Sequence, residues 1–303
     1  MHILVTGAGG FIGRSVVRKA RSRGWKVTAV ARRPTAESNL IADLRSPIRN
    51  WETPDAVIHL AGGYAGCGMK ELADTDLVIA KNLIDWGKKE GVRRWVFASA
   101  AEVYGDIDGE ADENYPCHPV IPYGKVKLLV EGMFHDAGLP EVMVCRVGEV
   151  YGSAGRILHE LGGKLRDGFC PWAGDGKVKI SFIHVEDAAE ALILACERAK
   201  SGFNVYNAGD SEPATWRQFL GEIATHLNVR SAYYLPKYFA YFYAASVSWM
   251  DRIFGRPPNV TPQVLRLLVT PKVLSSKSLR DQLGFAPQYS NIYIGLKEAL
   301  NKL

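Results

Sequence analysis

The strongest constraint on the fold of this chain is the alternation of short, continuously apolar runs with amphipathic stretches through its first half. The apolar runs predict strands and the amphipathic stretches predict helices. Strands that are apolar on both faces must be covered on both sides, which is typical of a parallel sheet built from right-handed crossover units. Gly24, Gly91 and Gly138 follow the predicted helices, where a left-handed cap is favoured. The predicted strands are residues 2–6, 26–31, 55–61, 94–100 and 141–147, and the predicted helices are 14–24, 77–91 and 126–138.

The alternation loosens after about residue 152. A strand running into a helix is still predicted within 179–199, and 204–210 predicts one more strand, but the remainder is mostly helical. We therefore predict an α/β protein with a Rossmann-type doubly wound parallel sheet and a smaller, mostly helical C-terminal substrate lobe. The first lobe comprises residues 1–152, completed by about 178–210, and the substrate lobe comprises 153–177 and 211–303.

A glycine-rich turn, TGAGGFIG at 6–13, stands between the first predicted strand and helix. Gly7 permits a tight turn, Gly10 lets the backbone approach a pyrophosphate, and Gly13 lets the helix pack closely on the strand. The helix N-terminus then points at the phosphate charge. Because this pattern lies inside a strand–helix–strand unit, it predicts a dinucleotide site.

The end of the second predicted strand bears on which dinucleotide binds. An NAD site usually places an acidic residue there for the ribose hydroxyls, whereas this chain has Arg32 and Arg33. Two guanidinium groups can pair with a 2′-phosphate, so we expect NADP rather than NAD, unless the arginines are simply solvated. Asp43 follows a short apolar run and is either an acceptor for the adenine amino group or a turn carboxylate.

The composition narrows the class of partner. The chain has 303 residues, 47% hydrophobic and 23% charged, with a formal charge of +5 and no dense basic run, so nucleic acid is not an expected partner. Five scattered cysteines without a paired motif indicate reduced thiols. The N-terminus enters an apolar strand at once and lacks the pattern of a signal peptide, so we expect a cytoplasmic protein.

An aromatic segment at 233–255 has an uncharged run too short to span a bilayer. We expect it to form a helix packed in the core or against a pocket. A helix resting on a membrane surface is the alternative. Its polar face is poor in Lys and Arg, so membrane contact is not expected.

Five motifs in order resemble one family. TGAGGFIG, HLAGG at 59–63, VYG at 103–105, YGKVK at 123–127 and SFIHVEDAAEA at 181–191 look like the extended short-chain dehydrogenase/reductases, the NAD(P)-dependent epimerases, dehydratases and reductases. The end of the chain is similar, more loosely, to the 3β-hydroxysteroid dehydrogenase-like and dihydroflavonol reductase-like branches. The resemblance implies further cofactor contacts at Phe11, Ile12, Leu44, Leu60, Ala61 and Gly62.

The resemblance also implies that Tyr123 is the catalytic acid/base and that Lys127 activates it and holds the nicotinamide ribose. The chemistry of the residues agrees, because a lysine one helical turn away lies on the same helix face and favours the phenolate. We therefore expect Lys127 to move the pKa of Tyr123 from its ordinary value near 10 toward working pH.

Relatives place Ser or Thr where this chain has Ala100. Three explanations remain open. Ser99 takes over the hydroxyl's role through a kink at the strand end; or another side chain, a water or the substrate supplies the hydrogen bond; or the protein binds without redox turnover. The side chains considered for the second explanation are Glu102, Tyr104 and Ser153.

The substrate clues are fewer. Ile180 and Ser181 stand where many sugar-nucleotide members carry Arg-Asp, although Lys179 remains nearby as a substrate contact. We expect an oxidoreductase acting on the carbonyl/alcohol pair of a small, rather apolar molecule. The alternatives are a nucleotide-sugar epimerase or dehydratase and a cofactor-binding regulatory protein.

His59 and His184 lack partners at metal spacing, so no metal is expected. The helices at 77–91 and 126–138 correspond to those that pair subunits in relatives, and their apolar content predicts a homodimer.

Overall fold

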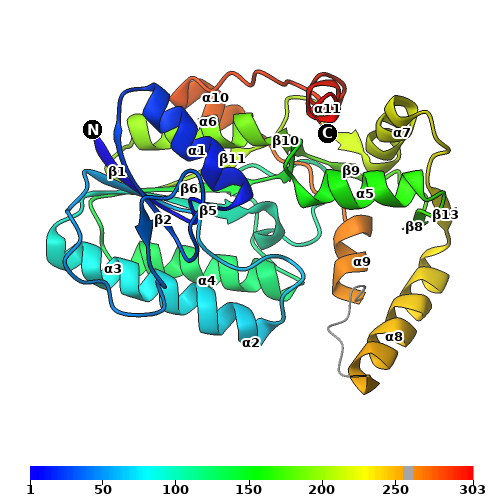
Figure 1. Cartoon of the computed structure of the whole chain (residues 1–303), viewed down its shortest axis with the longest axis horizontal. Coiled ribbons are helices and arrows are strands. Elements are labelled where there is room, and N and C mark those ends of the chain that lie inside the picture. Colours follow the sequence, from blue (N-terminus) through cyan, green and yellow to red (C-terminus); the bar gives the residue numbers. More distant parts are fainter. Residues whose placement is uncertain (255–261, 303) are drawn as a thin grey trace.

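The chain was analysed as a computed structural model that describes residues 1–254 and 262–302. Its centre is a parallel sheet in the order β11-β6-β5-β4-β1-β2-β3 (Figure 1). The seven strands are β1 (His2–Thr6), β2 (Lys26–Ala31), β3 (Leu40–Ile41), β4 (Ala56–His59), β5 (Arg94–Ala100), β6 (Glu141–Val147) and β11 (Gly202–Ala208). The strand order reverses direction at β1, between β2 and β4. In a doubly wound sheet the ligand crevice lies at that switch point, outside the carboxyl ends of the strands.

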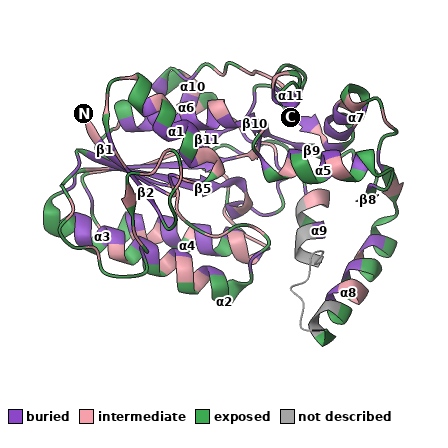
Figure 2. Ribbon diagram, viewed as in Figure 1, coloured by how far each residue is buried: buried purple, intermediate pink, exposed green. Residues whose placement is uncertain are grey.

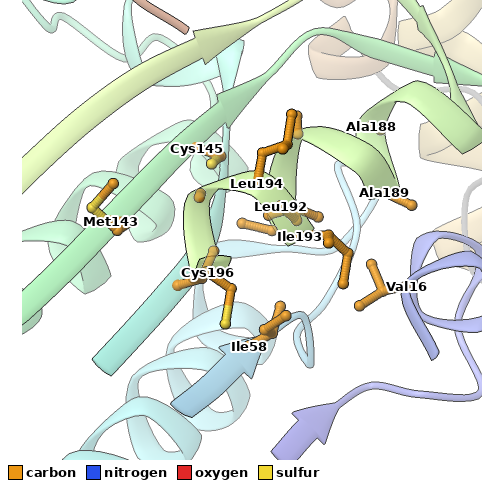
Figure 3. Packing of buried hydrophobic residues seen from close by; sticks show 14 of the residues in the cluster. Val16, Ile58, Met143, Cys145, Ala188, Ala189, Leu192, Ile193, Leu194 and Cys196 are labelled. Atoms are coloured by element: carbon orange, nitrogen blue, oxygen red, sulfur yellow. The ribbon is translucent and has the colours of Figure 1, made fainter. Parts of the chain in front are cut away.

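Helices cover both faces of the sheet, as the continuous apolar strands require (Figure 1). One face carries α1 (Phe11–Ser22), α6 (Val185–Glu197) and α10 (Lys277–Leu283), and the other carries α3 (Val78–Glu90) and α4 (Pro122–Asp136). On the first face, Val16 and Leu192 pack with the strand residue Ile58, all fully buried (Figure 3). The predicted sheet architecture is confirmed. Gly24, Gly91 and Gly138 have the positive φ expected of left-handed caps.

The part of the chain predicted as a substrate lobe has a second core, in which Phe182 stacks on Phe219 with ring centroids 4.6 Å apart. Three two-stranded pairs hold it, β7 with β10, β8 with β13 and β9 with β12. These strands are β7 (Glu149–Tyr151), β8 (Pro171–Ala173), β9 (Lys179–Ile180), β10 (Phe182–His184), β12 (Ala214–Thr215) and β13 (Tyr233–Leu235). The helices of this lobe are α5 (Arg156–Arg166), α7 (Trp216–Leu227), α8 (Lys237–Ile253), α9 (Pro262–Val269) and α11 (Ile292–Leu300).

The aromatic segment is placed differently from the expectation. It forms β13 and α8, and α8 projects from the substrate lobe beside α9 (Figures 1 and 2). Tyr238 is 89% exposed and Phe242 75% exposed, so core packing or pocket lining is wrong for the aromatic side of this helix. Residue 255, the end of the predicted segment, lies outside the described residues. None of the described helices is long and apolar enough to cross a membrane.

The apolar residues that suggested a homodimer lie mostly inside the subunit. Ile79, Leu83, Trp86 and Phe134 are buried in the core between the sheet, α3 and α4. A periodic apolar face cannot distinguish the subunit's own core from a partner. The homodimer stays a prediction, but this apolar content no longer supports it.

Candidate active site

The glycine-rich turn joins β1 to α1 at the switch point of the sheet. Gly7 has φ +67°, and a side chain there would come within 2.8 Å of the backbone nitrogen of Ala61. A side chain on Gly13 would come within 2.1 Å of the carbonyl oxygen of Gly7. The first turn of α1 contains no acidic residue, and its N-cap, Gly10, offers no side-chain acceptor. The amides at this helix start are therefore available to an anion, and the cradle fits a dinucleotide pyrophosphate.

The cofactor residues expected from β4 lie against this turn. The Thr6 hydroxyl accepts hydrogen bonds from the amides of Leu60 (3.1 Å) and Ala61 (3.2 Å). The same hydroxyl bonds to Nδ1 of His59 at 2.8 Å. Burial lowers the pKa of His59 to about 3, so its imidazole is neutral and orders the turn.

The residues expected to select the dinucleotide lie at the end of β2. Arg32 and Arg33 are exposed, and neither makes an ion pair within the part of the chain that the structure describes. Asp43 follows β3 and accepts hydrogen bonds from Arg45 on both oxygens, which lowers the pKa of its carboxyl to about 2. Leu44 is buried in the core. The pair of free guanidinium groups fits a 2′-phosphate, whereas Leu44 has a packing role.

Phe11 of α1 reaches the loop that follows β7. A side chain on Gly155 would come within 2.7 Å of the Phe11 ring, and one on Gly152 within 3.2 Å. Ser153, in this loop, is half-buried, and Lys179 of β9 is exposed. Neither side chain makes a hydrogen bond or ion pair within the described residues, so no contact ties either of them to the surroundings of Tyr123.

Tyr123 and Lys127 lie on the first two turns of α4, which begins at Pro122, earlier than predicted. Proline suits the first helical position because its fixed φ matches the helix and its missing N–H is not needed there. The buried Lys127 ammonium donates to the carbonyl oxygen of Ala98 at 3.2 Å. It lies 5.6 Å from the centroid of the Tyr123 ring. The pair predicted from the motif is thus brought together at the carboxyl end of β5.

The electrostatic surroundings of Tyr123 differ from the expectation. Burial raises the pKa of its hydroxyl, and the negative charges of Glu102, Asp76 and Glu149 raise it further. Burial also lowers the pKa of Lys127. The expectation that Lys127 moves the tyrosine pKa toward neutrality is therefore wrong for the chain by itself, because burial and, after it, the charges of three carboxylates raise that pKa.

Asp76 is a site residue that the motifs did not indicate. It lies on a π-helical turn, Ala73–Leu77, between α2 (Met69–Leu72) and α3. Its Oδ1 accepts from the amide of Gly63 at 2.7 Å, and any side chain on Gly62 would come within 2.7 Å of its Oδ2. Burial raises the pKa of Asp76, while the charge of Lys127 opposes that shift. The adjacent glycines were the available signal, since they make room for this carboxylate.

Ser99 does not take over the missing hydroxyl's place. It is paired in register with Arg146 of β6, without a bulge, and its hydroxyl donates to Glu131 Oε1 at 2.5 Å. Arg146 holds Glu131 with two hydrogen bonds and also donates to the hydroxyl of Tyr104 at 3.0 Å. Tyr104, 1% exposed, donates in turn to Asn207 at 2.8 Å. Both hydroxyls donate within this network, so the geometry speaks against catalytic Ser99 and substrate-contacting Tyr104.

Glu102 lies at the end of β5 and belongs to a buried ionic group. The Lys272 ammonium donates to Glu102 at 2.7 Å and to Glu149 at 3.3 Å. These charges raise the pKa of Lys272 above its ordinary value, whereas burial raises the pKa of Glu149. Glu102 and Lys272 line a pocket together with Gly105, Val120, Ile121, Arg266 and Thr270. Lys272 was not predicted, since only the folded chain brings it to Glu102 and Glu149.

His59 and His184 were considered as possible metal ligands. His184 accepts from the Glu186 amide through Nδ1 at 3.3 Å and caps α6, so its role is structural, as that of His59 is. Within the described residues, no group of His, Cys, Asp and Glu side chains is arranged to hold a metal ion.

A glycine cradle at the switch point of the sheet and a Tyr–Lys pair one helical turn apart are typical of nucleotide-dependent enzymes of the doubly wound class. Residues 3–209 match the NAD dependent epimerase/dehydratase family, and the chain belongs to it. The family assignment makes it an NAD(P)-dependent enzyme of the extended short-chain dehydrogenase type.

Three similar proteins have names or bound ligands that bear on the activity. A 2-alkyl-3-oxoalkanoate reductase from Stenotrophomonas maltophilia is 24% identical over 334 residues, covering 100% of this chain and 98% of the relative. The solved structure of MoeE5 in complex with UDP-glucuronic acid and NAD is 25% identical, with a TM-score of 0.81 and coverage of 100% and 98%. The human epimerase family protein SDR39U1 (isoform 2), solved with NADPH, is 23% identical, with a TM-score of 0.80 and full coverage of both chains. The relatives thus include both a reductase and a protein that binds an activated sugar.

Proposed function

We propose that this protein is an NADP-dependent reductase of a small, uncharged carbonyl compound, with Tyr123 as the proton donor. The observation that carries the proposal is the group of carboxylates facing Tyr123. Burial raises the pKa of the phenol, and the charges of Glu102, Asp76 and Glu149 raise it further, so the hydroxyl holds its proton at neutral pH. A protonated tyrosine is the acid that carbonyl reduction needs, whereas alcohol oxidation needs a base.

The same carboxylates argue for an uncharged substrate. Two buried cations, Lys127 and Lys272, balance the three acids only in part, so the surroundings of Tyr123 carry a negative excess. A substrate that brings further negative charge beside these acids would be repelled, more strongly in a buried site than in water. A relative of nearly full coverage is named a reductase of 2-alkyl-3-oxoalkanoates, which supports carbonyl reduction. That substrate carries a carboxylate, so the proposal of an uncharged substrate for this chain rests on the acids around Tyr123 alone.

The proposed roles of the chain follow from the geometry. The turn between Gly7 and Gly13 holds the pyrophosphate, and Arg32 and Arg33 hold the 2′-phosphate. NADPH supplies the hydride for the carbonyl carbon. Tyr123 donates its proton to the carbonyl oxygen, and Lys127 stabilises the phenolate that this leaves. With Ser99 and Tyr104 engaged elsewhere and the Glu102 carboxylate accepting from Lys272, the hydrogen bond that relatives supply at Ala100 is left to Ser153, water or the substrate.

A second candidate, a nucleotide-sugar epimerase, is favoured by Arg266. This arginine lines the pocket with its side chain 46% exposed, and it pairs with the exposed Asp106 at 3.0 Å. An exposed guanidinium at a pocket mouth can bind a diphosphate. The complex of MoeE5 with UDP-glucuronic acid shows that the fold accommodates such a ligand in a relative.

The experiment that separates the two is an NADPH-oxidation assay with purified protein on a panel of uncharged ketones and UDP-sugars. We expect net NADPH consumption with ketones and none with UDP-sugars. Glu102→Gln should lower the pKa that limits the reduction rate, whereas Glu110→Gln, an exposed acid on the same loop, should leave it unchanged. Interconversion of a UDP-sugar without net NADPH consumption would establish the epimerase instead.

A further inference from the structure

Helix α8 presents most of its large side chains to solvent, whereas small ones, with Tyr241, pack on the protein. Ala240 and Ala244 are buried against Ala173 of β8 and Leu265 of α9, and Ser248, one turn further on, is also buried. This is the reverse of an ordinary amphipathic helix, whose large apolar residues face the core. The small residues let α8 lie close to its neighbours, so the aromatic side is free for another contact.

The outward side of α8 forms a continuous apolar stripe, here called the aromatic ridge. It follows two rows at helical spacing, and every member is at least half exposed. The ridge comprises Tyr238, Phe239, Phe242, Tyr243, Trp249, Met250, Ile253 and the adjoining Phe254. Its exposed area is on the order of 800 Å², above the few hundred Å² that a monomeric protein usually exposes in one patch. A surface of this size indicates an interaction site.

Basic side chains surround the base of the ridge. Lys237 begins α8, and the amide of Tyr233 on β13 donates to Cys170 just before β8, at 2.9 Å, which brings the end of α5 to the same place. Phe169, 69% exposed, extends the apolar surface there. The exposed basic residues in these segments outnumber the acidic ones. They are Lys164, Arg166, Lys177, Arg230 and Lys237, against Asp167 and Asp175.

We propose that the aromatic ridge is a membrane-binding surface that lies in the interface of a bilayer containing anionic lipid. Tyr and Trp are the residues favoured at the boundary of headgroups and acyl chains, because each joins an apolar ring to a polar group. The basic rim complements anionic headgroups. This contact is peripheral, because α8 lies on the surface and does not cross it.

A lipid surface fits the ridge better than a second copy of the chain does. The ridge is convex, and α8 projects from the body (Figure 1). Two copies packed ridge against ridge would bring two basic rims of the same sign toward each other, which costs free energy. A bilayer accommodates a convex apolar helix and supplies the opposite charge.

Trp249 makes the proposal measurable in the full-length protein. It is 66% exposed, and the other six tryptophans are buried or partly buried. With vesicles of equimolar phosphatidylglycerol and phosphatidylcholine, we expect co-sedimentation and a blue shift of the tryptophan emission. Binding should be weaker with phosphatidylcholine alone and at high salt. Trp249→Phe should still bind the vesicles but lose the shift.

Matched variants complete the test. Phe242→Ser/Trp249→Ser should lower the apparent partition coefficient by roughly tenfold or more, because it removes two large rings from the interface. The control Val78→Ser/Leu129→Ser changes exposed apolar residues of α3 and α4 and should have little effect. Equal binding by both double variants would overturn the proposal. So would an absence of vesicle binding, or self-association that the ridge variant abolishes.

Discussion

Replacing Asp210 with asparagine should make the protein more stable at neutral and alkaline pH, by an amount that grows with pH. Asp210 follows β11, is 3% exposed, and neither of its carboxylate oxygens accepts a hydrogen bond within the described residues. Burial, with the charge of Asp187 as the second cause, raises its pKa from 3.8 to about 9, and the nearby backbone of His184, too poorly aligned for a regular hydrogen bond, opposes this only weakly. A carboxyl group that is harder to ionise in the folded state than in the unfolded state favours unfolding wherever the unfolded chain ionises.

The magnitude follows from the two pKa values. The stability is fully present below about pH 4, declines as pH rises, and levels off above about 9. Between these limits the decline is about 1.4 kcal/mol per pH unit, so the loss at pH 7 is on the order of 4 kcal/mol. A side-chain amide cannot ionise, so Asp210→Asn escapes this loss. Burying the amide can also cost free energy, but this cost does not depend on pH. It therefore shifts the difference in unfolding free energy between Asp210→Asn and the wild type by the same amount at every pH.

Urea denaturation at pH 5, 6, 7 and 8 tests this reasoning, with Asp108→Asn as the control at an exposed aspartate. The free energy of unfolding of Asp210→Asn, relative to the wild type, should rise at every step. The Asp108→Asn difference should stay flat. A pH-independent difference for Asp210→Asn, or one that falls with pH, would refute a buried neutral carboxyl at this position.

The remaining predictions concern the cofactor and catalysis. Because of Arg32 and Arg33, NADPH should bind at least tenfold more tightly than NADH, a gap of about 1.4 kcal/mol, and equal affinities by titration calorimetry would contradict the assignment. Tyr123→Phe should lower turnover by about a hundredfold or more while cofactor affinity barely changes, and unchanged turnover would exclude the family mechanism. Ala100→Ser should leave the steady-state rate unchanged or raise it, since it restores a donor. Ser99→Ala removes the hydrogen bond to Glu131. We therefore expect a change in the free energy of unfolding without a specific loss of turnover rate.

The sheet could be predicted from the sequence because its signals are local. The continuous apolar run of β5 coincides with the strand observed at Arg94–Ala100, and β6 likewise matches its prediction. The start of α4 was placed too late, although Pro122 carried the signal for a first helical position. The surface role of α8 could not be predicted, because the pattern of large and small residues shows that a helix has two faces but not which face is covered.

The candidate site likewise has a part that is encoded locally in the sequence and a part that only the tertiary fold assembles. The glycine turn is encoded within eight consecutive residues, so its geometry follows from the sequence alone. Asp76 acts on Tyr123 from a π-helical turn, and Lys272 reaches Glu102 from the segment after α9, both far from the YGKVK motif in the chain. Only the tertiary fold sets such distances, and charge interactions depend on them directly.

The protonation state of Tyr123 depends on groups that the tertiary fold assembles as well as on the local motif. From the motif, a lysine one turn away favours the phenolate and a catalytic base. In the folded chain, Lys127 donates to Ala98 and the phenol faces Glu102, Asp76 and Glu149, all of which favour the protonated form. In the proposed function the motif supplies the reacting group, whereas burial and the carboxylates around it favour its protonated form at neutral pH. A site with the same motif and fewer carboxylates would hold a more acidic tyrosine and would be better suited to oxidation.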